Sequence, residues 1–344
     1  MYFSSSNRNK IISIWLGIMC FCVVLMIFVG GVTRLTKSGL SITEWKPVSG
    51  IVPPLNIEEW NLEFDKYKNS PEYQKINYDL NFAEFKTIYL IEFIHRILGR
   101  LVGLIFIIPL IVFSLNGFIA PREYPIYFVG VILFFAQGLM GWYMVKSGLI
   151  SDPHVCHFRL AAHLFLAVML YTLFFRQYLK NKGYILLIPS ATDVSYLRKW
   201  CIMAIIVLLI QIIFGAFVAG LNAGHIYNEF PYMGGALIPY EIKVAGISLK
   251  SFMDPVFVQF IHRMCAYLLS FIIIIICIKG LKINNKQFSL VIAYIFAILI
   301  IQVLVGILTL LYNVPIELAL FHQFGAICLL SSLLTAYTLL CKVL

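Results

Sequence analysis

Charge is scarce in this chain of 344 residues, and negative charge is the scarcest. Charged residues make up 12% of the chain, whereas soluble domains carry roughly 25%. Asp and Glu number 16 against 26 Lys and Arg, and hydrophobic residues make up 61%. This composition excludes a water-soluble enzyme, a disordered chain and a nucleic-acid-binding protein, so we expect no nucleic-acid partner. It predicts an integral membrane protein surrounded by the lipid bilayer.

Cysteines with metal-binding spacing are missing as well. The eight cysteines form no Cys-x-x-Cys, and nearly all lie in apolar stretches, which argues against a disulfide framework or a zinc site. The residues before the first apolar run do not resemble an Arg-rich transit peptide, and that run is too long for a cleavable signal peptide. We therefore expect a bacterial cytoplasmic (inner) membrane rather than an organelle.

Long apolar runs are what the chain has in abundance. A helix that spans a bilayer needs about 20 mostly apolar residues. Eight runs meet this requirement, at 11–33, 87–115, 125–145, 156–179, 200–221, 255–278, 288–311 and 318–341. The predicted fold is an all-α, multi-pass membrane protein with eight transmembrane helices.

The segments between these runs differ in charge between the two sides. With the N-terminus inside, the inner segments hold twelve Lys and Arg and two acids. The outer segments hold ten Lys and Arg and thirteen acids. Because cytoplasmic loops are enriched in Lys and Arg, both termini are predicted in the cytoplasm. Charges within spans are costly, so those near or within them are candidates for function: Glu92, Arg96, Arg100, Arg159 and Arg263.

The second half of the chain repeats short motifs of the first. Phe-Ile-His-Arg occurs at 93–96 and again at 260–263. Further matched positions are Gln137 with Gln302, Gly141 with Gly306 and His163 with His322. We infer two pseudo-symmetric four-helix bundles, residues 1–180 and 181–344. An even number of spans per bundle makes the repeat parallel.

Four of the seven histidines occupy repeated positions: His95, His163, His262 and His322. Each lies about two turns below the outer end of its span, so the four imidazoles should lie at one depth near the outer face. Two facing neutral imidazoles can ligate a haem iron, which predicts one bis-histidine haem site in each half. Alternatively, each histidine binds a neighbouring backbone group. We expect the remaining three at the interface or in solvent: His154, His157 and His225.

One position differs between the two copies. Glu92 precedes His95 by three residues, whereas Gln259 precedes His262 by three. Residues three apart share a helix face, so Glu92 should face whatever His95 binds. The difference predicts that the first half performs chemistry, with Glu92 catalytic, and that the second half holds a cofactor. The alternative is that Glu92 only forms an ion pair with Arg96.

Arginines accompany the histidines. Arg96 and Arg263 directly follow His95 and His262, and Arg159 lies one turn before His163. Haem propionates are anionic and arginine binds carboxylates in a bidentate manner, so these three are candidates to bind them. The alternative for each is snorkelling to the interface. The outer segments 34–86 and 222–254 are predicted to form caps over this face.

Together these motifs resemble the haem A synthase family, which converts haem O to haem A for cytochrome oxidase. They lie at 30–40 (GGVTRLTKSGL), 92–96 (EFIHR), 159–163 (RLAAH), 259–263 (QFIHR) and 321–323 (FHQ), and the resemblance covers nearly the whole chain. It implies a haem b iron held by His262 and His322, a substrate haem near His95 and His163, and a functional carboxylate at Glu92. A subclass has two cysteines in the first outer segment. Residues 34–86 contain none, so the chain resembles the Cys-free class.

The resemblance also implies the reaction and its partners. It implies a membrane oxidoreductase of cytochrome oxidase biogenesis that oxidises a methyl group of haem O to a formyl group. Haem O synthase and an electron donor are the expected partners. Whether the chain forms a homo-oligomer is left open. The residues alone leave two alternatives. A two-haem b electron-transfer protein of the quinol or ferric reductase type would prefer haems at two depths, and a haem transporter or chaperone needs no difference between Glu92 and Gln259.

Overall fold

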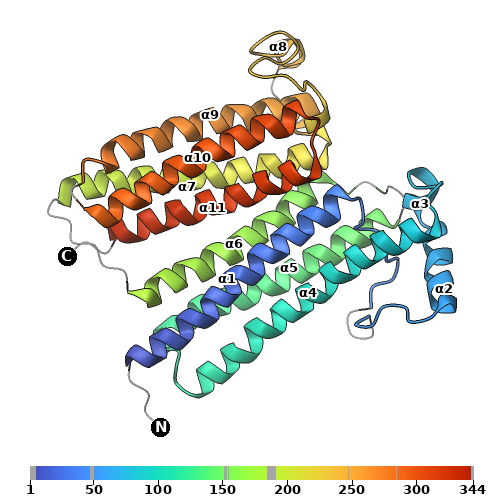
Figure 1. Ribbon diagram of the computed structural model, residues 1–344, viewed down its shortest axis with the longest axis horizontal. Helices are drawn as coiled ribbons and strands as arrows, with labels where there is room; N and C mark the ends of the chain where they lie inside the picture. The colour runs from blue at the N-terminus through green and yellow to red at the C-terminus, as the bar shows by residue number, and fades with distance from the viewer. Residues whose placement is uncertain are drawn as a thin grey trace. The chain divides into compact units, whose positions relative to one another are not determined.

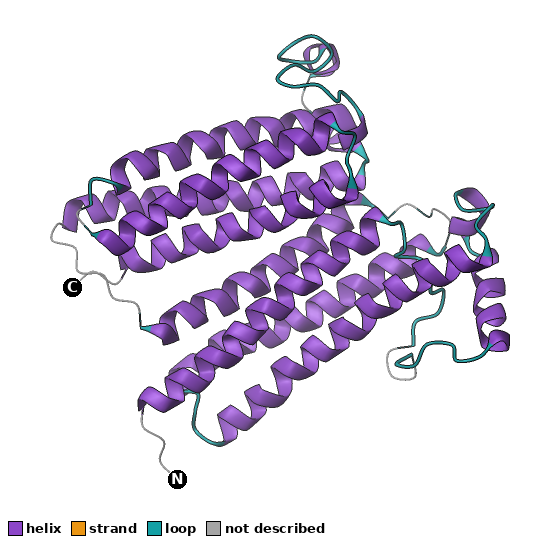
Figure 2. Ribbon diagram, in the orientation of Figure 1, coloured by secondary structure: helices purple, strands orange, loops and turns teal. Residues whose placement is uncertain are grey.

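The structure is a computed structural model that describes residues 5–46, 50–150, 153, 155–183, 191–246, 248–283 and 285–341. In these residues eight helices are long and apolar enough to cross a membrane, which confirms the all-helical class and the eight predicted spans (Figures 1 and 2). They are α1 (Ser5–Leu35), α4 (Phe82–Leu115), α5 (Tyr124–Gly148), α6 (His157–Lys182), α7 (Ala191–Gly220), α9 (Pro255–Gly280), α10 (Lys286–Leu311) and α11 (Ile316–Cys341).

Helix α4 begins five residues before its predicted start because its N-terminus is capped. The Asn81 side chain accepts from the Glu84 backbone N–H, and the Glu84 carboxylate accepts from the Asn81 N–H. These bonds satisfy amides that a helix end leaves without partners. At 34 residues α4 is about 51 Å long, whereas the hydrocarbon core measures about 30 Å, so α4 extends beyond it.

The chain divides into two compact units. One comprises 21–170, and the other comprises 1–20 together with 171–344. In the latter unit α7, α9, α10 and α11 pack side by side (Figure 1). Their contacts bury aliphatic side chains such as Ile273, Leu330 and Leu333. The boundary at residue 180 and the pseudo-symmetric repeat stay predictions.

The first outer segment has its own core. It contains α2 (Ile57–Lys68) and α3 (Pro71–Lys75), which cover the N-terminal end of α4 (Figure 1). Tyr67 and Phe85 are fully buried and stack with ring centroids 5.2 Å apart, with Ile42 and Tyr89 in the same cluster. Burial of aromatic side chains contributes strongly to stability. The described residues of this segment therefore form an ordered cap on α4.

The second outer segment is less regular. It contains two 3-10 turns, η2 (Ala223–His225) and η3 (Leu249–Met253), and the short helix α8 (Tyr240–Ala245). Met233 and Ala236 form an isolated β-bridge across Gly234 and Gly235. These glycines have φ of 66° and 72°, a region that glycine adopts without the steric cost of a Cβ. This turn explains the Gly-Gly pair in the sequence.

Candidate functional site

Each of the four repeated histidines lies against a glycine of a neighbouring membrane helix. The pairs are Gly30 with His95, Gly141 with His163, Gly215 with His262 and Gly306 with His322. A Cβ atom added to the glycine would lie 3.3 to 3.4 Å from the ring in the first three pairs and 2.6 Å in the fourth. The glycines therefore allow the helix backbones to approach the imidazoles closely.

A glutamine precedes three of these glycines by four residues, at Gln137, Gln211 and Gln302. The Nε2 atoms of Gln137 and Gln211 lie 3.3 and 3.2 Å from Nε2 of His163 and His262. A carboxamide nitrogen only donates, so each of these imidazole Nε2 atoms accepts and carries its lone pair. A lone pair on Nε2 is what a metal ion requires of histidine.

The third glutamine behaves differently, because Gln302 Nε2 donates to the backbone carbonyl of His322 at 2.9 Å. The internal repeat pairs Gln137 with Gln302, whereas Gln211 was not among the predicted site residues. The spacing Gln-x-x-x-Gly on α5, α7 and α10 is the signal that could have found it.

The structure brings the members of each predicted histidine pair together. The rings of His262 and His322 have centroids 6.4 Å apart. A metal-bound imidazole nitrogen lies about 2 Å from its ion, which places two rings on opposite sides of one ion about 6 Å apart. In the other unit, His95 and His163 are close enough to interact electrostatically. The spacing of His262 and His322 therefore fits a single iron.

Buried polar atoms without a protein partner gather at these pairs. In the described part of the chain they include Nδ1 of His163, His262 and His322, and Oε1 of Gln137, Gln211 and Gln302. Most buried polar groups have a partner, so this concentration indicates a binding site. Among the described residues, no three His, Cys, Asp or Glu side chains are grouped to hold a metal ion. Two histidines per site fit the axial ligation of a haem iron.

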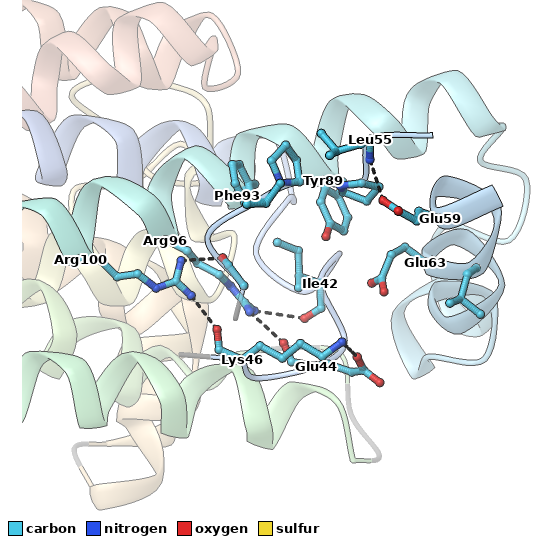
Figure 3. A pocket seen from close by; sticks show the side chains of 15 residues that line it. Ile42, Glu44, Lys46, Leu55, Glu59, Glu63, Tyr89, Phe93, Arg96 and Arg100 are labelled. Atoms are coloured by element: carbon cyan, nitrogen blue, oxygen red, sulfur yellow. Dashed lines mark hydrogen bonds and ion pairs between the residues drawn. The ribbon is translucent and has the colours of Figure 1, made fainter. Parts of the chain in front are cut away.

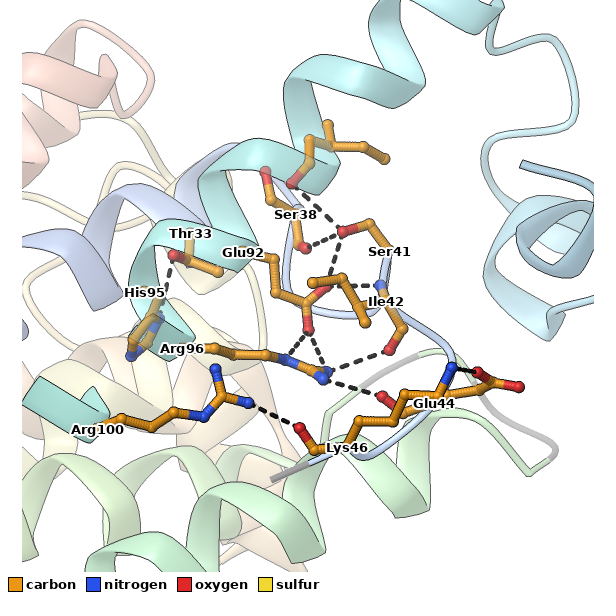
Figure 4. A network of polar contacts seen from close by, with 11 residues as sticks. Thr33, Ser38, Ser41, Ile42, Glu44, Lys46, Glu92, His95, Arg96 and Arg100 are labelled. Atoms are coloured by element: carbon orange, nitrogen blue, oxygen red, sulfur yellow. Dashed lines mark hydrogen bonds and ion pairs between the residues drawn. The ribbon is translucent and has the colours of Figure 1, made fainter. Parts of the chain in front are cut away.

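Glu92 is buried, with 3% of its surface exposed, and its carboxylate is directed to the first outer segment (Figure 4). Its Oε1 accepts from Nε and Nη2 of Arg96 at 3.0 and 2.6 Å. Its Oε2 accepts from the Ser41 hydroxyl at 2.7 Å and from the Ile42 N–H at 2.9 Å. The pairing of Glu92 with Arg96 is thus confirmed, and the catalytic role of Glu92 stays a prediction. We call Glu92, Arg96 and residues 41–44 the first clasp.

Gln259 and Arg263 form a second clasp with residues 223–232. Gln259 Nε2 donates to the carbonyls of Ala223 and Ile226 at 3.0 and 2.6 Å, and its Oε1 accepts from Arg263 at 3.3 Å. Arg263 also donates to backbone carbonyls at Tyr227, Glu229 and Tyr232. Arg263 and Gln259 therefore fasten the second outer segment to α9.

The three arginines differ in how many N–H groups they have in use. Arg96 donates to the carbonyls of Ile42 and Glu44 as well as to Glu92, so its donors are committed to the first clasp. Arg263 donates to the second clasp through Nη1 and Nη2, whereas its buried Nε has no hydrogen-bond partner among the described residues. The Arg159 guanidinium lies over the Tyr143 ring, 5.1 Å from its centroid. Propionate binding by the three arginines stays a prediction.

A pocket of about 360 Å³ lies between the first clasp and α2 (Figure 3). Arg96 and Arg100 line one side and Glu59 and Glu63 the other. Arg100 donates to the carbonyls of Lys46 and Gly50, which fastens this part of the first outer segment to α4. The four paired histidines are not among the lining residues, but Arg96, one of the propionate candidates, is.

The three remaining histidines have different surroundings. His157 is only 3% exposed, which excludes the solvated alternative, and its ring packs against Phe158 at the start of α6. A place at the interface stays a prediction. His225 is exposed, as expected, and its Nδ1 lies 2.8 Å from Oδ1 of Asn313. His154 lies outside the described residues.

Comparison with known proteins identifies the family. Residues 13–334 match the model of the COX15-CtaA family, described as cytochrome oxidase assembly protein. The haem A synthase of Rickettsia bellii (strain RML369-C) is 52% identical over 332 residues, which cover 96% of this chain and 99% of that protein. The haem A synthase of Rickettsia felis is 48% identical over 330 residues, which cover 96% of this chain and 98% of that protein. The chain therefore belongs to the haem A synthase (COX15-CtaA) family.

Proposed function

We propose that this chain is a haem A synthase that oxidises a methyl group of haem O to the formyl group of haem A. The observation that carries the proposal is the presence of two histidine pairs with unequal neighbours. The helix of His95 carries a buried carboxylate one turn earlier, Glu92, whereas the helix of His262 carries a buried neutral amide at the matching position, Gln259. The carboxylate supplies the first half with a group that can accept a proton, which the amide of the second half cannot do.

We assign haem b to His262 and His322 and the substrate haem to His95 and His163. When bound, the haem iron supplies the redox chemistry, and the protein supplies ligands, orientation and electrostatics. The imidazoles present nitrogen lone pairs, and the glycines leave room beside them. For the propionates, Arg159 is the strongest of the three candidates, because Arg96 and both Nη atoms of Arg263 already bind the outer segments.

We assign Glu92 the catalytic part in the first half. Oxidation of a methyl group requires protons to be moved and creates electron-poor carbon at the edge of the macrocycle. A carboxylate one turn from an axial ligand can accept a proton or stabilise positive charge there. The Arg96 pair and the two donors of residues 41 and 42 hold this carboxylate in one position.

The location and the partners follow from the charge pattern and the family. We place the protein in a bacterial inner membrane with both termini in the cytoplasm and the haem sites toward the outer face. Haem O synthase would supply the substrate, and a separate donor would supply electrons.

Replacement of single ligands tests the assignment. His262→Ala or His322→Ala should abolish the low-spin haem b spectrum, because bis-imidazole iron needs both ligands. His95→Ala or His163→Ala should spare this spectrum and eliminate haem A among the haems extracted and identified by mass. Loss of haem b in His95→Ala or His163→Ala, with retention in His262→Ala and His322→Ala, would reverse the roles of the halves. Absence of turnover of added haem O by the wild-type protein would favour a transporter or chaperone.

A second experiment tests Glu92. Glu92→Gln should bind haem b normally but yield less product haem per bound haem b, with haem O or a partly oxidised product accumulating. Glu63→Gln is the matched control, since Glu63 is a carboxylate of the same cap that pairs with Lys66. Equal product ratios in Glu92→Gln and wild type would leave Glu92 only its structural pairing with Arg96.

A further inference from the structure

His95 differs from the other three paired histidines in the surroundings of its Nδ1 atom. The hydroxyl oxygen of Thr33, on α1, lies 3.2 Å from Nδ1 of His95 (Figure 4). Nδ1 of His163, His262 and His322 has no partner among the described residues. Thr33 is only 6% exposed, so water does not compete freely for this bond. The first half therefore contains a histidine whose second nitrogen is already held by the protein.

The direction of this hydrogen bond follows from the hydroxyl itself. Thr33 Oγ1 donates to the Val29 carbonyl at 2.9 Å, and a hydroxyl has one hydrogen to give. Toward His95 the oxygen must then accept, so Nδ1 carries the proton and Nε2 carries the lone pair. Gly30 lies three residues before Thr33 on the same face of α1 and lets that face approach the ring.

We propose that Thr33 is a positioning residue for His95, which fixes the ring and its tautomer so that Nε2 is presented to the substrate haem iron. A ligating histidine whose other N–H is hydrogen-bonded is better oriented and is a stronger donor to the metal. The stronger donor favours the ferric state of the iron at this site. The inference rests on the proposed function only in naming haem as the ligand of His95, and it gives a role to the Gly-Gly-Val-Thr segment at 30–33.

The test compares Thr33→Val, which removes the acceptor at constant shape, with Thr33→Ser, which keeps it. Thr309→Val is the matched control, because Thr309 also follows a histidine-contacting glycine by three residues and donates to the carbonyl four residues back, at Val305. In haem-free, full-length protein with ¹⁵N-labelled histidine, NMR should show His95 protonated at Nδ1. Thr33→Val should change this signal, and Thr33→Ser and Thr309→Val should not.

The protein with haem bound gives a second readout. Thr33→Val should weaken haem binding at the first site by about 10- to 100-fold and shift its reduction potential upward, leaving the haem of the second site unchanged. Thr33→Ser should restore both values. An unchanged ¹⁵N signal and unchanged affinity in Thr33→Val would overturn the proposal. If the NMR result holds but His95→Ala binds haem normally at the first site, the ligand assignment is wrong and the Thr33 bond stands.

Discussion

At the first clasp Glu92 accepts hydrogen bonds from Ser41 and Ile42, whereas at the second clasp Gln259 donates to two backbone carbonyls. The arginine four residues later binds backbone carbonyls in both clasps. The two outer segments are thus fastened through the same helix positions but with opposite hydrogen-bond polarity.

The difference between Glu92 and Gln259 therefore has a structural cause beside the proposed catalytic one. A carboxylate only accepts, so it suits a segment that presents an O–H and an N–H, and an amide can donate to a segment that presents carbonyls. A glutamate at position 92 is therefore required by loop geometry as well as by the chemistry we propose.

The largest effect is expected from removing the arginines. Arg96→Met leaves the buried carboxylate of Glu92 without its cation, which costs about 3–5 kcal/mol. Arg263→Met leaves a neutral amide, and the loss is about 1–3 kcal/mol. Thermal unfolding in detergent measures both, and limited proteolysis should cleave 34–86 in the first variant and 222–254 in the second. Equal losses in the two variants would mean that the charge of Glu92 is not what distinguishes the clasps.

Exchange of the two residues gives the next effect. Gln259→Glu replaces the amide that donates to two backbone carbonyls by a carboxylate, which cannot donate. The free energy of unfolding should fall by about 1–3 kcal/mol for each carbonyl left without a donor. Glu92→Gln keeps one acceptor oxygen and should cost less. The measurement is the free energy of unfolding of both variants and of the double exchange. A greater loss in Glu92→Gln than in Gln259→Glu would contradict the assigned polarity.

Much of the fold could be predicted from the sequence, because a bilayer demands long apolar runs and penalises charge inside them. The eight spans followed from that demand. The start of α4 was placed too late, although Asn81 and Glu84 form a capping box that is readable from their spacing. The aromatic core of the first cap was not predictable in detail, because Tyr67 and Phe85 meet only after the chain folds back on α4.

The candidate site was predictable where its residues repeat. His95 and His262 share a four-residue motif, and the pairing of Glu92 with Arg96 follows from their spacing on one helix. The contacts of Ser41 and Thr33 were not predictable, because each joins helix α4 to a segment more than fifty residues away. No local period in a sequence reports such a contact.

The two caps should also respond to pH in opposite directions. Burial, with the nearby Glu92 charge, raises the pKa of Glu72 to about 7 despite a hydrogen bond from Tyr67 and the charge of Lys37. The folded cap therefore binds this proton more tightly than the unfolded chain, and its stability falls as pH rises from about 4.5 to 7, by about 3 kcal/mol in all.

Glu72→Gln should remove this dependence, with no change at pH 4 and a more stable first cap at pH 8, measured by thermal unfolding and proteolysis across pH. In the second outer segment the hydrogen bond from the Tyr227 hydroxyl lowers the pKa of the exposed Glu241. The stability that this hydrogen bond contributes is therefore lost as pH falls. A Glu72→Gln protein that keeps the wild-type pH profile would show that another group sets it.

The smallest effect concerns a single hydroxyl of the first clasp. Ser41 is 1% exposed and donates to Glu92 Oε2, so in Ser41→Ala no water readily replaces the lost donor. Hydrogen bonds to charged groups contribute about 1.5–3 kcal/mol, and the remaining donors of Ile42 and Arg96 keep the loss at the lower end. Ser38→Ala is the control, because Ser38 is equally buried but its hydroxyl pairs with the neutral Thr36 hydroxyl, for a loss of about 0.5–1.5 kcal/mol. A greater loss of unfolding free energy in Ser38→Ala than in Ser41→Ala would show that Ser41 adds little to the first clasp, and Glu92 would then be held by Arg96 and the Ile42 amide alone.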